Sequence, residues 1–167
     1  MKSVIDNQTP PSPAETETHE QSVIPVKAGI HPEPGIGKKY VTWADFDLLA
    51  EQIAFEIATS GWMPSCVYGV PRGGLCLAVR LSHMLGVPLM SRIRKDALVC
   101  DDIADTGTVL SKFQRDGVKT AVLIQKKRSK TVPDFLGVME DSDRWIVFPW
   151  ECDGIEDPVS RVKPPKP

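Results

Sequence analysis

The sequence predicts one α/β domain in which helices flank a parallel sheet and a small cap follows at the C-terminal end. Apolar runs short enough to be strands alternate along the chain with segments whose apolar residues recur at helical spacing. Glycine-containing turns follow these strands, as is typical of strand-to-helix connections. The chain has 167 residues, of which 41% are hydrophobic, and this is enough for one domain with its own core.

Proline marks the ends of the folded unit. Six of the fifteen prolines lie in residues 1–39 and four lie in residues 153–167. The first of these segments is polar and lacks periodicity, so we expect a disordered or loosely packed Pro-rich extension there, and a tail at the other end. The folded domain is therefore expected over residues 40–152, with the cap at about residues 126–152.

The first predicted helix spans residues 43–60. Thr42 and Asp45 have the spacing of a capping box, and the apolar residues that follow share one face of a helix. Gly61 is placed to end this helix. The elements expected next are a buried strand, a turn and a second helix: residues 66–70, residues 71–74 and residues 75–85.

The second half of the domain is predicted to contain further strands and one more helix. The Thr-Gly-Thr turn at residues 106–108 is expected to open a helix that runs to about Asp116 and is closed by Gly117. Residues 137–139 and 145–148 are expected to form short strands of the cap. Three other strands are predicted: residues 88–93, residues 97–100 and residues 119–125.

Charge and composition exclude several classes of function. A net charge of −2 provides no positive field for binding nucleic acid. No apolar run reaches the ~20 residues of a membrane-spanning helix, and the polar N-terminus lacks the apolar core of a signal peptide. The four cysteines are scattered without a C-x-x-C pair, which favours reduced thiols in a cytoplasmic protein.

The most informative segment is residues 97–109. An apolar strand there ends in Asp101 and Asp102, and Asp105 follows just before the Thr-Gly-Thr turn. Carboxylates at the end of a strand can hold the hydroxyls of a sugar and a divalent cation. Backbone N–H groups and hydroxyls of the turn can bind a phosphate. The segment therefore predicts a pocket for a phosphorylated ribose, although acids and threonines also occur at ordinary strand-to-helix turns.

A second turn, Pro71-Arg72-Gly73-Gly74, also follows a predicted strand. Because the carboxyl ends of parallel strands meet at one edge of a sheet, both turns belong at that edge. Glycines let the backbone approach a ligand closely, and the forked guanidinium of Arg72 suits phosphate oxygens. We interpret this turn as a second anion site; on its own it could equally be a tight connection with an incidental surface arginine.

Residues 97–109 resemble the phosphoribosyl-pyrophosphate motif of the type I phosphoribosyltransferases. In this motif an apolar strand is followed by Asp-Asp, two apolar residues, Asp-Thr-Gly and then small or hydroxyl residues. Val109 stands at the last position, where the family usually has Thr or Ala. The resemblance implies the fold of that family, a parallel sheet flanked by helices with a cap.

The later part of the chain is similar to the xanthine-guanine branch of this family. Trp145 and Ile146 follow Lys126 after nineteen residues and precede a Pro-Trp-Glu segment, where the family usually has Pro-Trp-Asp. The segment at residues 39–43 is also similar to the start of that family's domain. The resemblance therefore covers nearly all of residues 40–152.

The resemblance implies an enzyme that salvages purines. A nitrogen of a 6-oxopurine base (guanine, xanthine or hypoxanthine) displaces pyrophosphate from C1 of phosphoribosyl pyrophosphate and gives a nucleoside monophosphate, with Mg²⁺ as the cofactor. Asp105 is the implied catalytic residue, which takes or stabilises the proton at N7 of the purine, and Asp102 is the implied metal ligand. The residues implied in phosphoribosyl and pyrophosphate binding are Arg72, Gly73, Gly74, Asp101, Asp102, Asp105, Thr106, Gly107 and Thr108.

The same resemblance assigns the base-binding residues. Trp145 is implied to stack on the purine, backbone groups of Ile146 to read its edge, and Lys126 to donate to the oxygen at C6. Without the resemblance Trp145 could equally be a core tryptophan. The neighbouring cations Lys127, Arg128 and Lys130 are expected to form a solvated basic loop. Members of the family commonly form homo-oligomers, and we expect the same of this chain.

The chain departs from the family between the two turns. Only 28 residues separate Arg72 from Asp101, so the long mobile lid that closes over the ribose in family members is largely missing. The site would then be covered by residues 1–39 or by a neighbouring subunit, or it would be an open and slow transferase. The alternative is a protein of this fold that binds nucleotides or regulates, with little or no catalysis.

Overall fold

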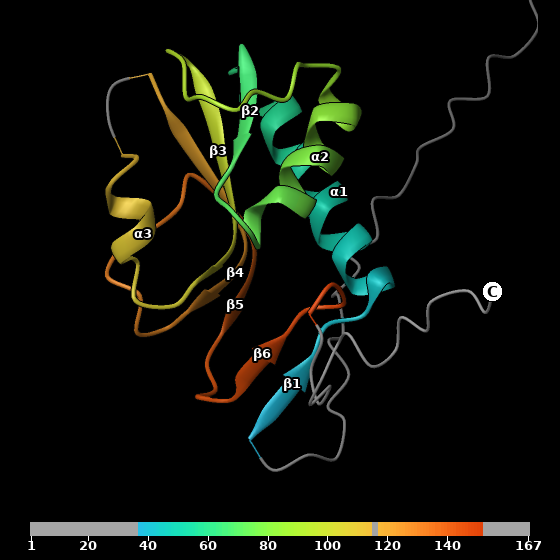
Figure 1. The fold of residues 1–167 in the computed structure, drawn as a ribbon, viewed down its shortest axis with the longest axis vertical. Helices are drawn as coiled ribbons and strands as arrows, with labels where there is room; N and C mark the ends of the chain where they lie inside the picture. Colours follow the sequence, from blue (N-terminus) through green and yellow to red (C-terminus); the bar gives the residue numbers. More distant parts are fainter. Residues whose placement is uncertain (1–36, 115–116, 152–167) are drawn as a thin grey trace, which may run out of the picture.

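The computed structural model describes residues 37–114 and 117–151 and shows a parallel sheet between helices (Figure 1). The four strands of the main sheet pair in the order β2-β3-β4-β5, and every pair is parallel. These strands are β2 (Cys66–Gly69), β3 (Ala97–Ala104), β4 (Lys119–Lys126) and β5 (Phe135–Glu140). The predicted α/β class with a parallel sheet is confirmed. The predictions for residues 1–36 and 152–167 lie outside the described residues.

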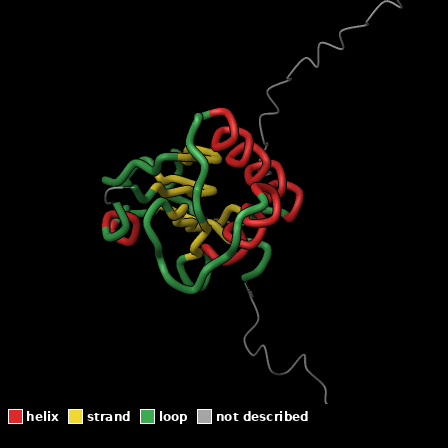
Figure 2. Tube along the Cα trace, turned by 90° about the horizontal axis from the view of Figure 1, so that it is seen from above, coloured by secondary structure: helices red, strands yellow, loops and turns green. Residues whose placement is uncertain are grey.

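Helices cover both faces of the sheet. The long helices α1 (Trp43–Thr59) and α2 (Gly74–Leu85) lie together on one face, and the short helix α3 (Thr108–Ser111) lies on the other. Figure 2 shows the strands between these two layers when the molecule is seen from above. The main core fills the space between the sheet and the pair α1 and α2. The buried apolar face of α1 consists of Phe46, Leu49, Ala50, Ile53, Ala54 and Ile57.

The predicted capping box at the start of α1 is present. The backbone N–H of Asp45 donates to Thr42 Oγ1 (3.1 Å), and the Asp45 carboxylate accepts from the backbone N–H of Thr42 (2.9 Å). Two N–H groups that have no partner inside the helix are thereby satisfied. The cap fixes where α1 begins and thus how its apolar face meets the sheet.

We expect Thr42→Ala to lower the free energy of unfolding by about 1 kcal/mol, because the N-cap hydroxyl is lost. Urea denaturation followed by circular dichroism measures this change. Thr59→Ala, in the last turn of the same helix, removes a hydroxyl that donates to the carbonyl of Phe55 and is exposed. This control should change stability by less than half as much, and an equal loss in both variants would contradict the role of the cap.

A second, two-stranded sheet lies beyond the carboxyl ends of the main strands (Figure 1). Strand β1 (Lys38–Tyr40) pairs in parallel with β6 (Trp145–Val147), so the two ends of the described chain meet there. Phe148 and Trp150, just after β6, stack at 4.9 Å, and the Trp150 ring packs edge-on against Phe46 of α1. These rings anchor the small sheet to the main domain. The sequence did not predict β1 as a strand.

The prediction of a strand at residues 88–93 is wrong. Only Leu89 forms a bridge, with Val67 of β2, through the bonds Val67 N–H to Pro88 O (2.9 Å) and Met90 N–H to Val67 O (2.8 Å). Proline has no N–H to donate, and after Met90 the chain turns back so that β3 can begin at Ala97. Residues 91–96 therefore form a short connection.

The helix after the Thr-Gly-Thr turn is also shorter than predicted. It was expected to reach Asp116 but ends at Ser111. The next N–H groups, of Lys112 and Phe113, bond to carbonyls only three residues back, which tightens and ends the helix. The Phe113 ring packs at 6.2 Å from that of Tyr68 on β2.

The strand expected at residues 137–139 as part of the cap belongs to the main sheet instead. It lies within β5, which pairs with β4 along residues 135–140. Gly137 allows this packing, because a Cβ there would lie 2.5 Å from the carbonyl oxygen of Leu123 and 3.2 Å from the Leu49 side chain. A glycine inside a strand often marks a place where another part of the chain approaches closely. The short apolar run by itself does not distinguish a strand of the cap from a strand of the main sheet.

Two further findings concern the described residues. Within these ranges no helix is long and apolar enough to cross a membrane. Cys66, Cys76 and Cys100 are free thiols, and Cys66 and Cys100 are buried.

Candidate phosphoribosyl site

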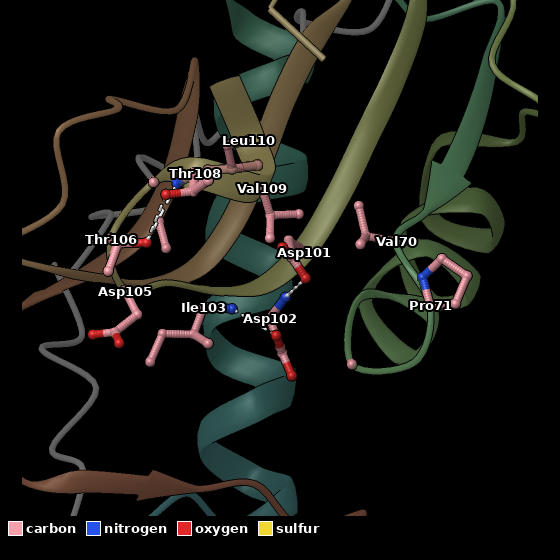
Figure 3. Close-up of a pocket in the computed structure, with 13 residues that line it drawn as sticks. Val70, Pro71, Asp101, Asp102, Ile103, Asp105, Thr106, Thr108, Val109 and Leu110 are labelled. Carbon is pink, nitrogen blue, oxygen red and sulfur yellow. Dashed lines mark hydrogen bonds between the residues drawn. The ribbon is translucent and has the colours of Figure 1, made fainter. Parts of the chain in front are cut away.

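A hollow of about 310 Å³ lies at the carboxyl ends of β2 and β3 (Figure 3). One wall is the turn between β2 and α2, with Val70, Pro71 and Gly73, and the other is the end of β3 with the loop that leads into α3. Figure 3 shows the side chains of Asp101 and Asp102 between these walls. The remaining lining residues are Ile103, Ala104, Asp105, Thr106, Gly107, Thr108, Val109 and Leu110.

Asp101 and Asp102 are crowded together at this edge of the sheet. The Asp101 side chain is buried, and the backbone N–H of Asp102 donates to its Oδ1 (3.1 Å); the N–H of Ile103 donates to Asp102 Oδ1 (2.8 Å). Burial, and then the charge of Asp102, raise the pKa of Asp101 to about 7. Burial also raises the pKa of Asp102. Such a pair favours a bound cation or hydroxyl donors, because both relieve the repulsion between two carboxylates.

The turn at residues 71–74 packs directly against this pair. A Cβ on Gly73 would overlap the Asp102 carboxylate, and a Cβ on Gly74 would overlap the backbone carbonyl of Cys100. Both glycines are therefore needed for the turn to approach β3. The peptide bond between Pro71 and Arg72 is cis, and the Arg72 side chain is exposed.

The Thr-Gly-Thr turn has a conformation that its sequence dictates. Gly107 adopts φ +80°, and a Cβ there would lie 2.6 Å from Thr131 Oγ1. The hydroxyls of Thr106 and Thr108 lie 3.1 Å apart and both residues are exposed at the mouth of the hollow. Because α3 has only four residues, hydroxyls and N–H groups of the turn, rather than a helix dipole, are the groups available to a phosphate.

The loop between β4 and β5 supports this turn from behind. The hydroxyl of Thr131 donates to the carbonyl oxygen of Gly107 (2.9 Å), and the backbone N–H of Lys130 donates to that of Thr106 (3.2 Å). Thr131 is buried, so the bond it makes is shielded from water. The loop therefore fixes the turn against the end of the sheet.

Asp105 is half-buried and forms a bidentate pair with Arg128. Arg128 Nε donates to Oδ1 (2.8 Å) and Nη2 donates to Oδ2 (2.7 Å). Arg128 lies in an exposed loop, as expected, but its guanidinium is paired with Asp105, which the sequence did not predict. Its Nη1 also lies 3.9 Å from the carboxylate of Asp143, in the loop that leads to β6.

Lys126, at the end of β4, is buried rather than free. Its Nζ donates to the carbonyl oxygens of Ser142 (2.8 Å) and Arg144 (2.5 Å), and burial lowers its pKa. A second buried charge, Glu140, pairs with Lys39 of β1 and accepts from the N–H of Ser142 (2.9 Å). Burial alone would raise the pKa of Glu140, but these bonds hold it at about 2.

These contacts fix the segment that leads into β6, the strand that contains Trp145 and Ile146. The Trp145 side chain is 67% exposed, so it is not a core tryptophan, whereas Ile146 is buried in the core. The backbone N–H of Trp145 donates to the carbonyl oxygen of Gly37 (2.7 Å). An exposed indole on a backbone segment that polar contacts hold in place is suited to stack on a flat ligand.

Most of the residues expected to bind phosphoribosyl lie around one hollow, but not all of them. Arg72 and Gly74 do not line it, and the three residues expected to bind the base lie outside it on β4 and β6. Sequence reasoning missed Arg128 and the supporting residue Thr131. Their positions could not be read from the sequence, because a Lys- and Arg-rich segment looks the same whether or not one member meets an acid far along the chain.

Among residues 37–114 and 117–151 there is no group of three or more His, Cys, Asp or Glu side chains that could hold a metal by themselves. The oxygen donors of Asp101 and Asp102 suit Mg²⁺, which is often held by one or two carboxylates together with phosphate oxygens of a substrate. The donor set therefore fits a metal that arrives with a phosphorylated ligand.

Comparison with known proteins places this geometry in a family. No protein-family model matches the sequence, and no curated protein is similar to it at a significant level. Among solved structures, the chain is similar to a purine phosphoribosyltransferase from Pyrococcus horikoshii, with 32% identity over 69% of this chain and 95% of that chain and a TM-score of 0.59.

Two more distant structures share the fold. A xanthine-guanine-hypoxanthine phosphoribosyltransferase from Helicobacter pylori has 23% identity over 70% of this chain and 95% of that one, with a TM-score of 0.57. A hypothetical protein from Neisseria gonorrhoeae with bound ppGpp has 20% identity over 71% and 91%, also with a TM-score of 0.57. From the identity and coverage of the Pyrococcus match, together with the acid pair and the two turns of the hollow, the chain belongs to the type I phosphoribosyltransferases, a family of enzymes that includes the purine phosphoribosyltransferases.

Proposed function

We propose that this enzyme transfers the phosphoribosyl group of phosphoribosyl pyrophosphate to a 6-oxopurine base, giving a nucleoside monophosphate and pyrophosphate in purine salvage. The observation that carries the proposal is the single hollow that combines two crowded carboxylates, a hydroxyl-lined turn and a glycine turn. A phosphorylated ribose that carries a diphosphate needs these three kinds of group side by side. The Pyrococcus relative, a purine phosphoribosyltransferase, supports the choice of a purine as acceptor.

The donor is divided among the walls of the hollow. We assign the ribose hydroxyls to Asp101 and Asp102, because carboxylates accept from vicinal hydroxyls. The 5′-phosphate is assigned to the turn at residues 106–108, whose hydroxyls and N–H groups are donors. The diphosphate is assigned to the turn at residues 71–74, where the backbone can come close and Arg72 can add a cation.

Mg²⁺ would be held by Asp102, with Asp101 beside it, and by oxygens of the donor. The raised pKa values of both carboxyls support this assignment, because burial disfavours the charged form of each and a bound cation would favour it. When bound, a divalent cation neutralises charge on the departing pyrophosphate.

The base is assigned to the space next to Trp145. Its exposed indole would stack on the purine, and backbone groups of Ile146 would meet the base edge. Lys126 has three N–H donors, of which two bind carbonyls, so one remains for the oxygen at C6 of the base. Since this ammonium has no acceptor, a base with an amino group at C6 is disfavoured.

The transfer then needs one proton acceptor. The bond from C1 of the ribose to the pyrophosphate oxygen breaks, the bond from C1 to N9 of the purine forms, and the proton at N7 leaves. Asp105, three residues after Asp102, is assigned to accept or stabilise that proton as a general base. The pyrophosphate leaves with the electron pair of the broken bond.

The test is an activity assay with phosphoribosyl pyrophosphate and Mg²⁺ across guanine, hypoxanthine and xanthine, with adenine and orotate as negative controls. We expect turnover of at least one of the three 6-oxopurines and none of the controls. Calorimetry of the same protein with nucleoside monophosphates distinguishes the alternative, a nucleotide-binding or regulatory protein. Binding without turnover of any base would favour that alternative, which the ppGpp-bound Neisseria structure with this fold makes worth testing.

We expect Trp145→Ala to raise the KM for the base by roughly 10-fold or more, since stacking on an aromatic ring contributes about 1–3 kcal/mol. The free energy of unfolding should change little, because the ring is mostly exposed. Phe55→Ala on α1 removes an aromatic ring that is 60% exposed and serves as the matched control. An unchanged KM in the Trp145 variant would remove this residue from the base site.

We also propose that the enzyme acts in the cytoplasm as a homo-oligomer. Free Cys66, Cys76 and Cys100 are compatible with a reducing compartment. Since residues 91–96 form only a short connection where family members carry a lid, a neighbouring subunit is one source of cover for the ribose. Analytical ultracentrifugation with and without the donor measures the state of assembly.

A further inference from the structure

Arg128 contacts the proposed general base through both of its carboxylate oxygens. The fork from Nε and Nη2 to the two oxygens of Asp105 has lengths of 2.8 and 2.7 Å, which is the geometry of a strong, planar pair. The two side chains are 55% and 41% exposed. Because the pair is exposed, it contributes little to the free energy of unfolding. Its main effect is on the orientation of the Asp105 carboxylate.

The backbone that carries Arg128 is held in place on both sides. Before it, Lys126 is anchored by two carbonyls, and after it the N–H of Ser129 donates to the carbonyl oxygen of Lys126 (2.9 Å). Further along the loop, Lys130 and Thr131 donate hydrogen bonds to backbone carbonyls of the turn at residues 106–108. The guanidinium is therefore presented from a fixed loop, not from a free end.

The position of the guanidinium is between the two halves of the proposed site. On one side it binds Asp105, and on the other its Nη1 lies 3.9 Å from Asp143, two residues before Trp145. The purine proposed above would lie between Asp105 and Trp145. Arg128 thus borders the space where the N7 edge of the base would meet its proton acceptor.

We propose that Arg128 is a positioning residue that orients the Asp105 carboxylate for the base. The inference rests on the proposed function, in which Asp105 receives the N7 proton. A carboxylate offers about four lone-pair positions, and the fork occupies two of them, so two remain for the N7–H of the base. Because a bidentate fork fixes the plane of both groups, the free lone pairs point in one direction instead of sampling many.

Lysine cannot replace arginine in this role. An ammonium carries the same charge but is a single point donor, so it would leave the carboxylate free to rotate. The exposed Lys127, next to Arg128 in the same loop, provides a matched control for loss of one positive charge without loss of the fork.

The test is a mutant cycle with Arg128→Ala, Asp105→Asn and the double variant, with Arg128→Lys and Lys127→Ala beside it. We expect Arg128→Ala to lower kcat for the preferred 6-oxopurine by roughly 10- to 100-fold, because a misplaced catalytic group costs about that much. The KM for phosphoribosyl pyrophosphate should stay within twofold. The double variant should match Asp105→Asn alone, since Arg128 has no carboxylate to orient once Asp105 is replaced.

The same cycle is read on binding of 9-deazaguanine, which keeps the N7–H, in the presence of phosphoribosyl pyrophosphate and Mg²⁺. Calorimetry should show weaker binding by Arg128→Ala than by the wild type, and equal binding by the double variant and Asp105→Asn alone. Arg128→Lys should not restore wild-type behaviour, and Lys127→Ala should match the wild type. Circular dichroism confirms that each variant is folded.

Three results would overturn the inference while leaving the proposed function intact. Effects of Arg128→Ala and Asp105→Asn that multiply in the double variant would mean that Arg128 acts without Asp105. Full activity in Arg128→Lys would mean that a positive charge near Asp105 is sufficient and the fork is not needed. A higher kcat in Arg128→Ala would mean that the arginine hinders proton transfer to Asp105. If the wild-type protein neither turns over nor binds any purine base, the proposed function itself fails, and this role of Arg128 fails with it.

Discussion

Gly73→Ala is expected to abolish most of the transferase activity while leaving the protein folded. The backbone at Gly73 has φ −59° and ψ −44°, a conformation that alanine adopts readily, so the fold should not be strained. The added Cβ would instead overlap the Asp102 carboxylate and displace it from the hollow. We expect kcat/KM for the donor to fall by roughly 100-fold or more, as measured by steady-state kinetics, because the proposed metal and ribose ligand has moved.

Gly86→Ala provides the opposite signature. Gly86 has φ +66° at the end of α2, and a Cβ there would meet nothing within 4 Å. This variant should lose about 1 kcal/mol of stability and keep its kinetics, because the cost is only that of the left-handed backbone. If Gly73→Ala keeps its kcat/KM within threefold, the turn at residues 71–74 does not hold Asp102 in the position that the proposed function requires.

Asp101→Asn is expected to stabilise the protein at pH 8 and to inactivate it. Asp101 has a pKa of about 7 in the folded protein against 3.8 ordinarily, chiefly because it is buried. A carboxyl whose pKa is raised by folding destabilises the folded state wherever it must be ionised. The penalty is absent below about pH 4, grows as the pH rises towards 7 and is constant above that.

The amide of the variant cannot ionise, so the penalty disappears. At about 1.4 kcal/mol for each pKa unit, the gain at pH 8 is at most about 4 kcal/mol, and we expect about 2 kcal/mol. Urea denaturation at pH 8 and at pH 4 should show the gain only at the higher pH. Asp47→Asn, on the exposed face of α1, is the control and should change little at either pH. Equal stability of Asp101→Asn and wild type at pH 8 would contradict a buried, ionised acid at this position.

The parts of the molecule that the sequence predicted well depend on neighbours along the chain. The capping box of α1 needs only Thr42 and Asp45, and its atoms form both bonds. The acid pair and the Thr-Gly-Thr turn lie within eight residues, so the end of one strand and the loop after it bring them to one hollow. In these segments the local pattern and the tertiary structure favour the same geometry.

The parts that it missed depend on partners far away. Whether residues 88–93 form a strand depends on how much of β2 they can pair with, and a proline together with the return to Ala97 leaves one bridge. Arg128 reaches an acid 23 residues earlier in the chain, and Lys126 is buried by carbonyls 16 and 18 residues later. Residue type gives the charge of such groups but not the distance to the groups that they meet.

The ladder between β1 and β6 has a thermodynamic consequence. Its three residue pairs join positions 107 residues apart, since Lys38 faces Trp145, and it forms a sheet of its own that shares no strand with the main sheet. Because this ladder has only three residue pairs, whereas β3 and β4 lie inside the four-stranded sheet, we expect its amides to exchange with deuterium sooner than those of β3 and β4. The Trp145 indole, which we assign to purine binding, belongs to this ladder. Binding of a purine base should therefore slow the exchange of the β1 and β6 amides with deuterium.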